Sequence, residues 1–472
     1  MPSLILSADS YKHSHYRQYP PNINYISGYI EARSNSFSDK VLFFGLQTFL
    51  KQYGSQKLTM EDVNEAAGIS AKHGVPFNRS GWEIIVDELG GYLPLEIRAL
   101  EEGRVVPCSI PLLQVVNTDP RFPWLTMFVE TALLRAIWYP SSVATLSWKA
   151  KKMFLSALMH TSDQPEDHID TRLHDFGARG VSSGESAGLG GMAHLINFIG
   201  TDTMEGLCAA MEYYNATPVP GISIPAAEHS TITAWGRDRE LDAYSHILDE
   251  YSGTGKVLAI VSDSYDLELA VRDIWGDSLR SKVLAAGGTL VVRPDSGDPV
   301  ETPIKVISTL YDKFGGSINS KGYRVLNPAV RVLQGDGMSI TAIASLLTRL
   351  GEEGWSAENI ACGMGGGLLQ NVNRDTLNFA MKANAVCEAT GEWRDAQKKP
   401  AEDLSKSSKA GRQKVTFDGQ TYKTQRIDAG SEDQGDLKTV FRNGEILKSE
   451  RFEDIRERAR SALEADLNNS EF

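Results

Sequence analysis

The chain has 472 residues, of which 41% are hydrophobic and 23% charged, and its formal net charge is −13. This length predicts two or more domains, and the acidic balance argues against nucleic acid as a partner, because phosphate backbones attract basic surfaces. No stretch approaches the roughly 18 apolar residues of a membrane span, and the opening MPSLILSADSYKHSHYRQYP lacks the basic leader of a signal peptide. The four cysteines have no zinc-binding spacing and predict buried free thiols. We therefore expect a cytoplasmic protein with no membrane partner.

The two flanks of the chain differ in pattern from its middle. Residues 90–118 are interrupted by Pro and Gly and rich in β-branched side chains, which predicts short antiparallel strands. Residues 121–160 are rich in aromatic side chains and predict long packed helices, and the tail FEDIRERARSALEADLNN predicts an amphipathic helix. The polar residues 395–412 predict a mobile loop, which is either a solvated linker or a lid that closes over phosphate.

The middle of the chain alternates apolar segments with segments of helical periodicity. About seven apolar segments end in polar or glycine residues, within RLHDFGARG, HLINFIGTDT, GISIPAAEHS, VLAIVSDSYD, TLVVRPDSG, AVRVLQGDG and ENIACGMGGG. This alternation predicts βαβ units and a parallel sheet, and the number of similar units favours a closed or nearly closed α/β barrel over an open sheet. We expect the barrel within residues 161–380, with its chemistry at the carboxyl ends of the strands.

The phosphate-binding motifs of common nucleotide folds are missing. The sequence contains neither GxxxxGK[ST] nor a GxGxxG that opens a first βα unit, which argues against a P-loop ATPase and a dinucleotide-binding domain. Instead, GMGGGLL at residues 363–369 follows a predicted strand, where backbone amides can cradle a phosphate. A glycine run also permits close packing of a helix on a strand, and LQGDG at the preceding strand end strengthens the phosphate interpretation.

Charged residues follow several of the predicted strands. Arg293 and Asp295 in RPDSG suit a phosphate and a divalent cation or sugar hydroxyls, and Arg179 in HDFGARG suits a phosphate. Structural explanations also exist, because Arg and Asp often form an ion pair, and Asp266 in SDSYD could orient a histidine or only cap a helix. Gathered on one rim of a barrel, these groups predict a site for a phosphorylated sugar with Mg²⁺.

His229 lies between an apolar segment and a helix in GISIPAAEHSTITAWG, directly after Glu228. Near a helix N-terminus the dipole disfavours a protonated histidine, and a neutral imidazole there can accept a phosphoryl group. His229 could instead be a metal ligand, a general base or a hydrogen-bonded structural histidine. The HSH at residues 13–15, with His174, His229 and Asp295 at strand ends, leaves a metal-dependent amidohydrolase as a distant alternative.

Nine motifs follow one another in the order of a known family. They are DSYKHSHYRQYP, HDFGARGVSS, GTDT, PAAEHSTITAWG, VSDSYD, RPDSG, LQGDG, GGGLLQ and NRDTLNFAMK, and together they resemble the nicotinamide phosphoribosyltransferases, which are type II phosphoribosyltransferases. The resemblance implies an α/β barrel beside an α+β domain that both chain ends build, from residues 1–160 and 381–472. It also implies a homodimer with active sites at the interface. The reaction implied at these sites requires Mg²⁺ and joins nicotinamide to 5-phosphoribosyl 1-pyrophosphate, giving nicotinamide mononucleotide and pyrophosphate. It is a pentosyl transfer of NAD salvage.

The resemblance further implies roles for individual residues. Phe176 and Tyr11 of the partner subunit would cover the two faces of the pyridine ring, and Asp202 would accept a hydrogen bond from the carboxamide. Arg293 would lie close to the ring and ribose, with Asp295 toward the ribose and metal. The ribose and phosphates of the substrates would be bound by Gly335, Asp336, Gly365, Gly366, Arg374, Arg179 and Lys382, together with Arg33, Lys398 and Lys406 of the partner subunit.

In the same family the residue that matches His229 is phosphorylated by ATP, which improves substrate binding and drives the reaction toward product. Asp266 would orient the imidazole and, with Asp295, hold Mg²⁺, while Glu228 and Ser262 would support this arrangement from behind. Ala178 and Met364 depart from the pattern, because Tyr and Ser are expected there. These two positions concern the outer wall of the pocket rather than the reaction.

Two alternatives stay close to this fold. A nicotinate-using relative is the nearer one, and Asp202 argues against it because its charge would repel a carboxylate. A non-catalytic interaction protein is the other, and the set of Arg, Asp and Gly residues at the strand ends argues against it.

Overall fold

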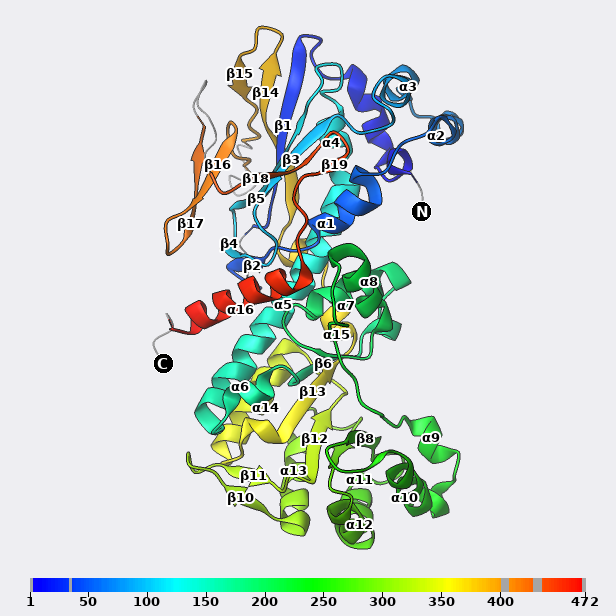
Figure 1. Ribbon diagram of the computed structural model, residues 1–472, viewed down its shortest axis with the longest axis vertical. Coiled ribbons are helices and arrows are strands. Elements are labelled where there is room, and N and C mark those ends of the chain that lie inside the picture. The colour runs from blue at the N-terminus through cyan, green and yellow to red at the C-terminus, as the bar shows by residue number, and fades with distance from the viewer. Residues whose placement is uncertain (1–2, 34–35, 400–406, 428–434, 469–472) are drawn as a thin grey trace. The chain divides into compact units, whose positions relative to one another are not determined.

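Two large sheets organise the chain, one in each of the two units of the computed structural model (Figure 1). The structure describes residues 3–33, 36–399, 407–427 and 435–468. Unit 1 comprises Met1–Thr145, Glu212–Ala216 and Val372–Ala462, and unit 2 comprises Leu146–Met211, Thr217–Asn371 and Leu463–Phe472. The boundaries fall at 145 and 372 rather than at the predicted 160 and 381. One reason is that a single continuous helix, α5 (Glu130–Thr161), is divided between the units.

Unit 2 is built on a six-stranded parallel sheet with the strand order β7-β6-β13-β12-β9-β8. The strands are β6 (Leu173–Asp175), β7 (Gly200–Thr201), β8 (Val257–Val261), β9 (Thr289–Arg293), β12 (Val330–Gln334) and β13 (Ile360–Met364). The segment 222–226 joins the two edges, since Ile222 pairs with Gly200 of β7 and Ala226 pairs with Ala259 of β8. This arrangement confirms the predicted nearly closed α/β barrel and its strand segments.

Helices connect the barrel strands in the predicted alternation. They are the second part of α5, α6 (Pro165–Ile169), α7 (Gly184–His194), α8 (Met204–Tyr214), α9 (His229–Thr233), α10 (Glu240–Tyr251), α11 (Leu267–Leu269), α12 (Arg280–Ala285), α13 (Glu301–Phe314), α14 (Ile340–Glu352) and α15 (Gly366–Leu369), with a hairpin of β10 (Gly316–Ile318) and β11 (Arg324–Leu326). α14 shows why such segments fold as helices. Ser339 caps its first turn by accepting a hydrogen bond from the Ala342 N–H, and Ile343, Leu346 and Leu350 bury one face at helical spacing.

The interior of the barrel is lined by small and apolar side chains. Ala259 of β8, Val291 of β9 and Leu333 of β12 form a buried cluster, against which Phe176 and Ile224 pack. Since side chains alternate between the two faces of a strand, residues from different strands can meet in this way only on the inner face of the ring. Residues two positions further along each strand therefore face the carboxyl-terminal rim of the barrel.

Unit 1 contains a seven-stranded antiparallel sheet with the order β15-β14-β1-β5-β3-β18-β19. Its strands are β1 (Ile23–Glu31), β3 (Leu95–Ala99), β5 (Pro111–Asn117), β14 (Ala380–Glu388), β15 (Trp393–Asp395), β18 (Lys438–Arg442) and β19 (Glu445–Ile446). Strands from the two chain ends lie side by side, as Figure 1 shows for blue β1 and gold β14. The sheet thus confirms that both ends build one α+β unit.

Unit 1 also contains helices and two separate two-stranded sheets. They are α1 (Leu46–Phe49), α2 (Met60–His73), α3 (Arg79–Asp87), α4 (Leu125–Phe128), the first part of α5, most of α16 (Phe452–Asn468), and the strand pairs β2 (Lys40–Leu42) with β4 (Val105–Pro107) and β16 (Gln413–Phe417) with β17 (Tyr422–Arg426). The antiparallel strands within 90–118, the long helix within 121–160 and the C-terminal helix confirm the pattern-based predictions. The described part of the predicted loop at 395–412 contains no helix, and residues 400–406 lie outside the described residues.

Two expectations from composition can be compared with the structure. In the described part of the chain, no helix combines the length and apolar character needed to cross a bilayer. All four cysteines are free, and Cys362 and Cys387 are buried as predicted, whereas Cys108 is only partly buried. Cys208 is exposed on α8, so the prediction of a buried thiol is wrong there, because it lies on a side of the helix where Met204 and Met211 are also exposed in the described structure.

Glu102 is a carboxyl group buried in the core of unit 1. It accepts hydrogen bonds from the Gly45 N–H at 2.5 Å, the Gln47 N–H at 3.0 Å and the Tyr214 hydroxyl at 2.8 Å. Burial nevertheless raises the pKa of Glu102 to about 7, because loss of hydration disfavours the charged form more than these donors favour it.

This pKa predicts a pH-dependent stability. The folded-state pKa of about 7 exceeds the ordinary value of 4.5, so the stability that Glu102 contributes is complete below about pH 4.5 and is lost as the pH rises through 7. Between pH 5 and pH 8 the wild type should lose on the order of 3 kcal/mol of unfolding free energy relative to Glu102→Gln, measured by urea denaturation. Glu61→Gln, an exposed residue of α2, is the control. If the unfolding free energy of Glu102→Gln and of Glu61→Gln depends on pH in the same way, burial of Glu102 is not the cause of the pH dependence.

Candidate active site

The carboxyl ends of the six parallel strands meet at one rim of the barrel. Because all the strands run in the same direction, the residues that follow them share this rim. They are Phe176 after β6, Asp202 after β7, Asp263 after β8, Asp295 after β9, Gly335 after β12 and Gly365 after β13. The structure therefore gathers residues that the sequence spreads over most of the barrel.

The ring of Phe176 lies at this rim, next to two glycines. A Cβ atom on Gly363 would lie only 2.0 Å from Cε2 of the ring. A Cβ on Gly335 would lie 3.6 Å from the same atom, 3.1 Å from Asp295 Oδ1 and 3.7 Å from Arg293 Cδ. Glycine at 363 thus leaves room for the ring, and Gly335 lies close to the ring, a guanidinium and a carboxylate at once.

Arg293 has an unused donor at the rim. Its side chain is 14% exposed, and Nε lies 3.8 Å from Asp295 Oδ1, too far for a hydrogen bond. Among the described residues this buried Nε has no hydrogen-bond partner. Since buried guanidinium donors are normally paired, Arg293 is suited to receive an oxygen atom of a ligand.

His229 begins α9 and has partners on both sides of its ring. Nδ1 lies 3.1 Å from Ser264 Oγ, and Nε2 lies 3.5 Å from Asp295 Oδ2 and 3.8 Å from Asp263 Oδ1. Asp263 is itself held in place, because its Oδ2 accepts hydrogen bonds from the Asp295 N–H and the Ser296 hydroxyl. Its Oδ1 is buried without a hydrogen-bond partner in the described structure. These contacts hold the imidazole ring between Ser264 on one side and two carboxylates on the other.

The carboxylates beside His229 differ from those expected. Asp266 caps α11, where it accepts a hydrogen bond from the Leu269 N–H at 3.0 Å, and the structure gives no ion pair between Asp266 and His229, both of which it describes. Sequence reasoning selected the second Asp of SDSYD, whereas the structure brings the first, Asp263, to the imidazole. Strand alternation could have identified Asp263 from the sequence. Ala259 and Val261 face the inside of the barrel, and Asp263 continues the same pattern of every second residue.

Glu228 and Ser262 lie outside the immediate surroundings of the His229 ring. Glu228 is exposed and accepts a hydrogen bond from the Ser230 hydroxyl. Ser262 is buried on the outer side of its strand, where it accepts a hydrogen bond from Trp275 Nε1 at 3.0 Å. Both therefore support the local backbone, and any effect on His229 is indirect.

Asp202 is a fixed acceptor at the end of β7. Its Oδ1 accepts a hydrogen bond from Ser223 Oγ at 2.5 Å, and its N–H donates to the Asp175 carbonyl at 2.9 Å. His174 lies nearby, and burial lowers its pKa while Asp202 opposes that shift. Ser223, which sequence reasoning missed, fixes one carboxylate oxygen and leaves the other for a ligand.

The glycine-rich end of β13 adjoins the turn that carries Arg179. Arg179 is exposed on the short turn Ala178–Gly180, and a Cβ on Gly180 would lie 3.3 Å from the Gly366 nitrogen. Asp336 is exposed on the loop after β12. These groups border the same rim as Phe176. Of the two departures from the family pattern, Ala178 belongs to this turn, whereas Met364 is fully buried and packs toward Gly367.

The remaining predicted binding residues belong to unit 1, where four of them form a group that we call the basic cluster: Arg33, Arg374, Lys382 and Lys398. Burial lowers the pKa of Lys382, and the positive charges of Arg33, Lys398 and Arg374 lower it further, against the opposing effect of Glu130. The other three cations therefore lie near enough to act on the charge of Lys382, and a group of cations suits a polyanion. Lys406 lies outside the described residues.

Tyr11 also belongs to unit 1. It lies on the short helix Ser10–Arg17, and its ring is 58% exposed. Its ring contacts His15 edge-to-face at 5.0 Å. One face of the Tyr11 ring is therefore accessible to another molecule.

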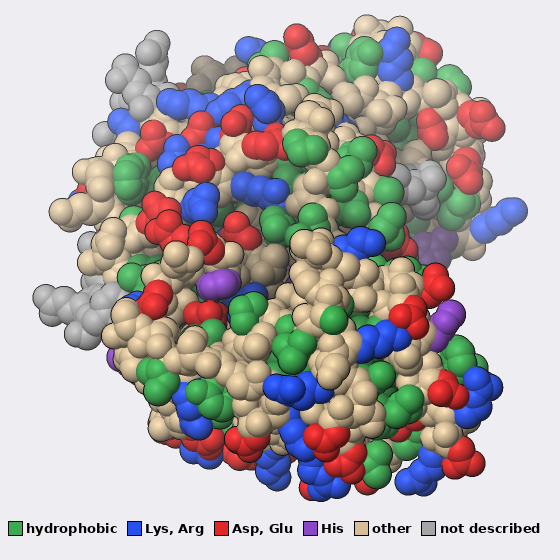
Figure 2. Space-filling view, turned by 60° about the horizontal axis from the view of Figure 1, so that its bottom comes forward, with side chains coloured by type: hydrophobic (Ala, Val, Ile, Leu, Met, Phe, Trp, Pro, Cys, Tyr) green, Lys and Arg blue, Asp and Glu red, His purple; other side chains and the backbone are tan. Residues whose placement is uncertain are grey.

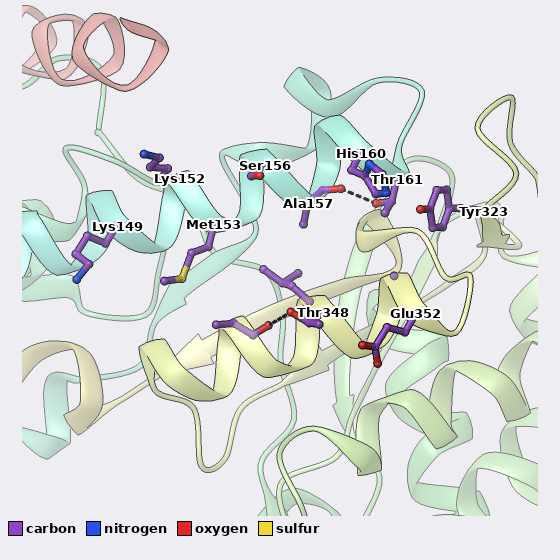
Figure 3. Close-up of a pocket in the computed structure, with 13 residues that line it drawn as sticks. Lys149, Lys152, Met153, Ser156, Ala157, His160, Thr161, Tyr323, Thr348 and Glu352 are labelled. Carbon is purple, nitrogen blue, oxygen red and sulfur yellow. Dashed lines mark hydrogen bonds between the residues drawn. The ribbon is translucent and has the colours of Figure 1, made fainter. Parts of the chain in front are cut away.

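A cavity of about 690 Å³ lies on the outside of the barrel rather than at its rim (Figure 3). Its walls are the faces of α5 and α14, including Met153, Ala157 and Leu347, with His160 and Tyr323 at one end. None of the residues predicted for the active site lines it, and its surface is largely apolar. We therefore place the candidate active site at the strand ends.

The amidohydrolase alternative lacks its ligand set. The described residues contain no group of three or more His, Cys, Asp or Glu side chains that could hold a metal ion. His13 packs against Phe77 and Phe128 instead, with ring centroids 5.8 Å and 5.2 Å away. On the face that Figure 2 shows, Lys and Arg side chains are interspersed with Asp and Glu.

Comparisons with known proteins add to this geometry. Residues 171–445 match the model of the nicotinate phosphoribosyltransferase (NAPRTase) family, and residues 3–97 match the nicotinamide phosphoribosyltransferase N-terminal domain. The chain is 47% identical over 98% of both chains to the nicotinamide phosphoribosyltransferase of Xanthomonas campestris pv. campestris. It is 32% identical over 97% of both chains to that of Acinetobacter baylyi.

Solved structures resemble the fold. The nicotinate-nucleotide pyrophosphorylase of Pyrococcus furiosus has a TM-score of 0.62 at 15% identity, covering 98% of this chain and 96% of its own. Human nicotinic acid phosphoribosyltransferase has a TM-score of 0.55 at 18% identity, covering 97% and 93%. From the family match, the full-length relatives and the rim geometry, we conclude that the chain belongs to the nicotinamide phosphoribosyltransferases of the nicotinate phosphoribosyltransferase family.

Proposed function

We propose that this chain joins nicotinamide to 5-phosphoribosyl 1-pyrophosphate, giving nicotinamide mononucleotide and pyrophosphate. The observation that carries the proposal is the grouping of the Phe176 ring with Arg293 and Asp295 around Gly335, with Gly363 against the ring. An aromatic face suits a pyridine ring, and the charged neighbours suit a phosphorylated sugar. The 47% identity to a relative that bears this name supports the same reaction.

The reaction requires electrostatic help more than a strong base. The ring nitrogen of nicotinamide attacks C1 of the ribose with its own lone pair, and the bond from C1 to the pyrophosphate oxygen breaks. The ring gains positive charge as the leaving group departs with its electron pair. The face of Phe176 stabilises a developing pyridinium ion, while Asp202, held by Ser223, accepts a hydrogen bond from the carboxamide.

The rim also fits a magnesium ion. Mg²⁺ binds through one or two carboxylates and completes its shell with water and substrate phosphates. Asp295 is accessible, and Asp263 Oδ1 is a buried oxygen without a hydrogen-bond partner in the described structure. We propose that these two residues would hold the ion. Asp266, which the SDSYD motif suggests for this role, is engaged in capping α11. When bound, Mg²⁺ would neutralise charge on the pyrophosphate leaving group.

His229 is suited to a stimulating role for ATP. A phosphoryl group would pass from ATP to a lone pair of the imidazole, with ADP as the leaving group. The contacts to Asp263 and Asp295 on one side and Ser264 on the other keep the ring at the rim. A phosphorylated His229 would add fixed charge next to the site where the pyrophosphate leaves.

A second copy of the chain would complete the site. On α8, which begins two residues after Asp202, Met204, Cys208 and Met211 form an exposed apolar stripe at helical spacing. Exposed apolar patches of this kind mark protein interfaces. In the proposed homodimer the partner would supply Tyr11 as the second aromatic face. We also place the enzyme in the cytoplasm, which free cysteines favour.

The reaction itself is the first prediction. Purified protein with nicotinamide, 5-phosphoribosyl 1-pyrophosphate and Mg²⁺ should form nicotinamide mononucleotide, detected by chromatography, and ATP should raise the rate. Nicotinate in place of nicotinamide should react at least tenfold more slowly, because the Asp202 carboxylate repels another carboxylate. Absence of the mononucleotide with and without ATP would contradict the proposal, and faster use of nicotinate would reassign the substrate.

The carboxylate beside His229 provides a second prediction. Asp263→Asn should remove most of the ATP stimulation, because it removes the charge that the structure places next to the imidazole. Asp266→Asn is the matched change, and it should keep the stimulation because Asn also caps a helix well. His229→Ala should abolish the ATP effect and the acid-labile protein-bound phosphate. The rate is measured with and without ATP, and loss of stimulation in Asp266→Asn alone would restore the sequence-based assignment.

A further inference from the structure

We propose that Glu31 is a positioning residue that fixes Arg33 and Lys398 of the basic cluster for the pyrophosphate group of the substrate. The inference rests on the proposed function and deepens it. Glu31 ends β1 and is 3% exposed. A buried carboxylate beside a binding site for a polyanion should weaken binding by repulsion. The presence of Glu31 at this position therefore requires an explanation other than direct electrostatic attraction.

Glu31 lies between two cations. Its Oε1 lies 3.3 Å from Arg33 Nε, and its Oε2 lies 2.9 Å from Lys409 Nζ as an ion pair without hydrogen-bond alignment. Each carboxylate oxygen thus faces one cation, and each cation comes from a different part of the chain. The carboxylate links the end of β1 to the segment around Lys409.

Lys409 is fastened to β1 at a second point. Its backbone N–H donates to the Tyr29 hydroxyl at 2.9 Å. Tyr29 is fully buried and pairs with Lys382 of β14, so it belongs to the rigid centre of the sheet. Tyr29 and Glu31 are two residues apart on one strand and therefore point to the same side. Together they fix both the backbone and the side chain of Lys409.

The fixed Lys409 in turn places Lys398. The preceding residue, Ser408, donates its backbone N–H to the Lys398 carbonyl at 2.9 Å, and the Lys398 N–H donates to Ser408 Oγ at 2.9 Å. These two bonds hold Lys398 and Ser408 against each other. A continuous set of contacts therefore connects Glu31 with Arg33 on one side and, through Lys409 and Ser408, with Lys398 on the other.

The geometry at Arg33 shows what this arrangement provides. Glu31 engages Nε, whereas Nη2 is buried and has no hydrogen-bond partner among the described residues. A planar guanidinium held at one nitrogen presents its other donors in a fixed direction. Because binding energy is lost when a flexible cation must first be ordered, a fixed Arg33 should bind a phosphate oxygen more tightly than a free one.

Glu31→Gln distinguishes a positioning role from a purely electrostatic one, because the two roles predict changes of opposite sign in the affinity for pyrophosphate. Removing a negative charge near the cluster should tighten pyrophosphate binding about twofold if Coulomb attraction alone decides. Loss of positioning should weaken it roughly tenfold. We expect the Kd for Mg²⁺-pyrophosphate, from calorimetry, and the KM for the phosphoribosyl substrate to rise about tenfold, and the KM for nicotinamide to change less than twofold. Unchanged or tighter binding by the folded variant would overturn the proposal.

Tyr29→Phe tests the same contacts without changing charge. It removes the hydroxyl that receives the Lys409 N–H and keeps the buried ring, so it also serves if Glu31→Gln does not fold. We expect a roughly threefold rise in the KM for the phosphoribosyl substrate alone. In the double variant with Lys409→Met, the KM should rise little further than in the single variants, because both changes break the same set of contacts. A wild-type KM in Tyr29→Phe, or full additivity in the double variant, would overturn the proposal.

Glu96→Gln is the matched control. Glu96 lies on β3 of the same sheet and its Oε2 is 3.6 Å from Arg442 Nε, away from the basic cluster in the strand order. This variant should bind pyrophosphate like the wild type, and the same weakening in Glu96→Gln would overturn a specific role of Glu31. Failure of the proposed function looks different, because the wild type itself would then form no mononucleotide. With an active wild type, the Glu31 variants test the positioning role alone.

Discussion

The contact between the ring of Phe176 and the backbone of Gly363 decides what the rim of this barrel can bind. A side chain at 363 would occupy the position of the ring, and a side chain at 335 would enter the space between the ring, Asp295 and Arg293. The parallel strands bring these residues together, and the glycines keep the space between them open. In the proposed reaction, binding of the pyridine ring and approach of the sugar would depend on these two positions.

Each of the two units carries charged side chains of both signs at its predicted binding residues. At the rim, Asp263 and Asp295 face His229 while Arg293 keeps an unpaired donor. In unit 1, the basic cluster surrounds Lys382, and a buried carboxylate, Glu31, holds two cations in place. A chain of net charge −13 can therefore offer local sites to anionic substrates, because the fixed geometry of a few cations matters more than total charge.

The sequence predicts much of this structure, and physical reasons explain the remainder. Periodicity identifies the barrel strands and helices because each buries one face, and the rim residues follow from strand direction. The unit boundary inside α5 leaves no sequence signal, since one helical pattern continues through Thr145. The SDSYD motif by itself favours Asp266, and only strand alternation extended past Val261 points to Asp263. Ser223 and Glu31 act through contacts with residues distant in sequence, Asp202 and Lys409, which no local pattern reveals.

The central claim is that the space beside Phe176 holds the pyridine ring, and binding of nicotinamide to Gly363→Ala tests it most directly. The added methyl group would lie 2.0 Å from ring atom Cε2, so the ring must shift from its position. The account predicts that calorimetry or equilibrium dialysis will show at least tenfold weaker nicotinamide binding, with pyrophosphate binding and thermal stability close to those of the wild type. Unchanged nicotinamide affinity in that folded variant would contradict the account.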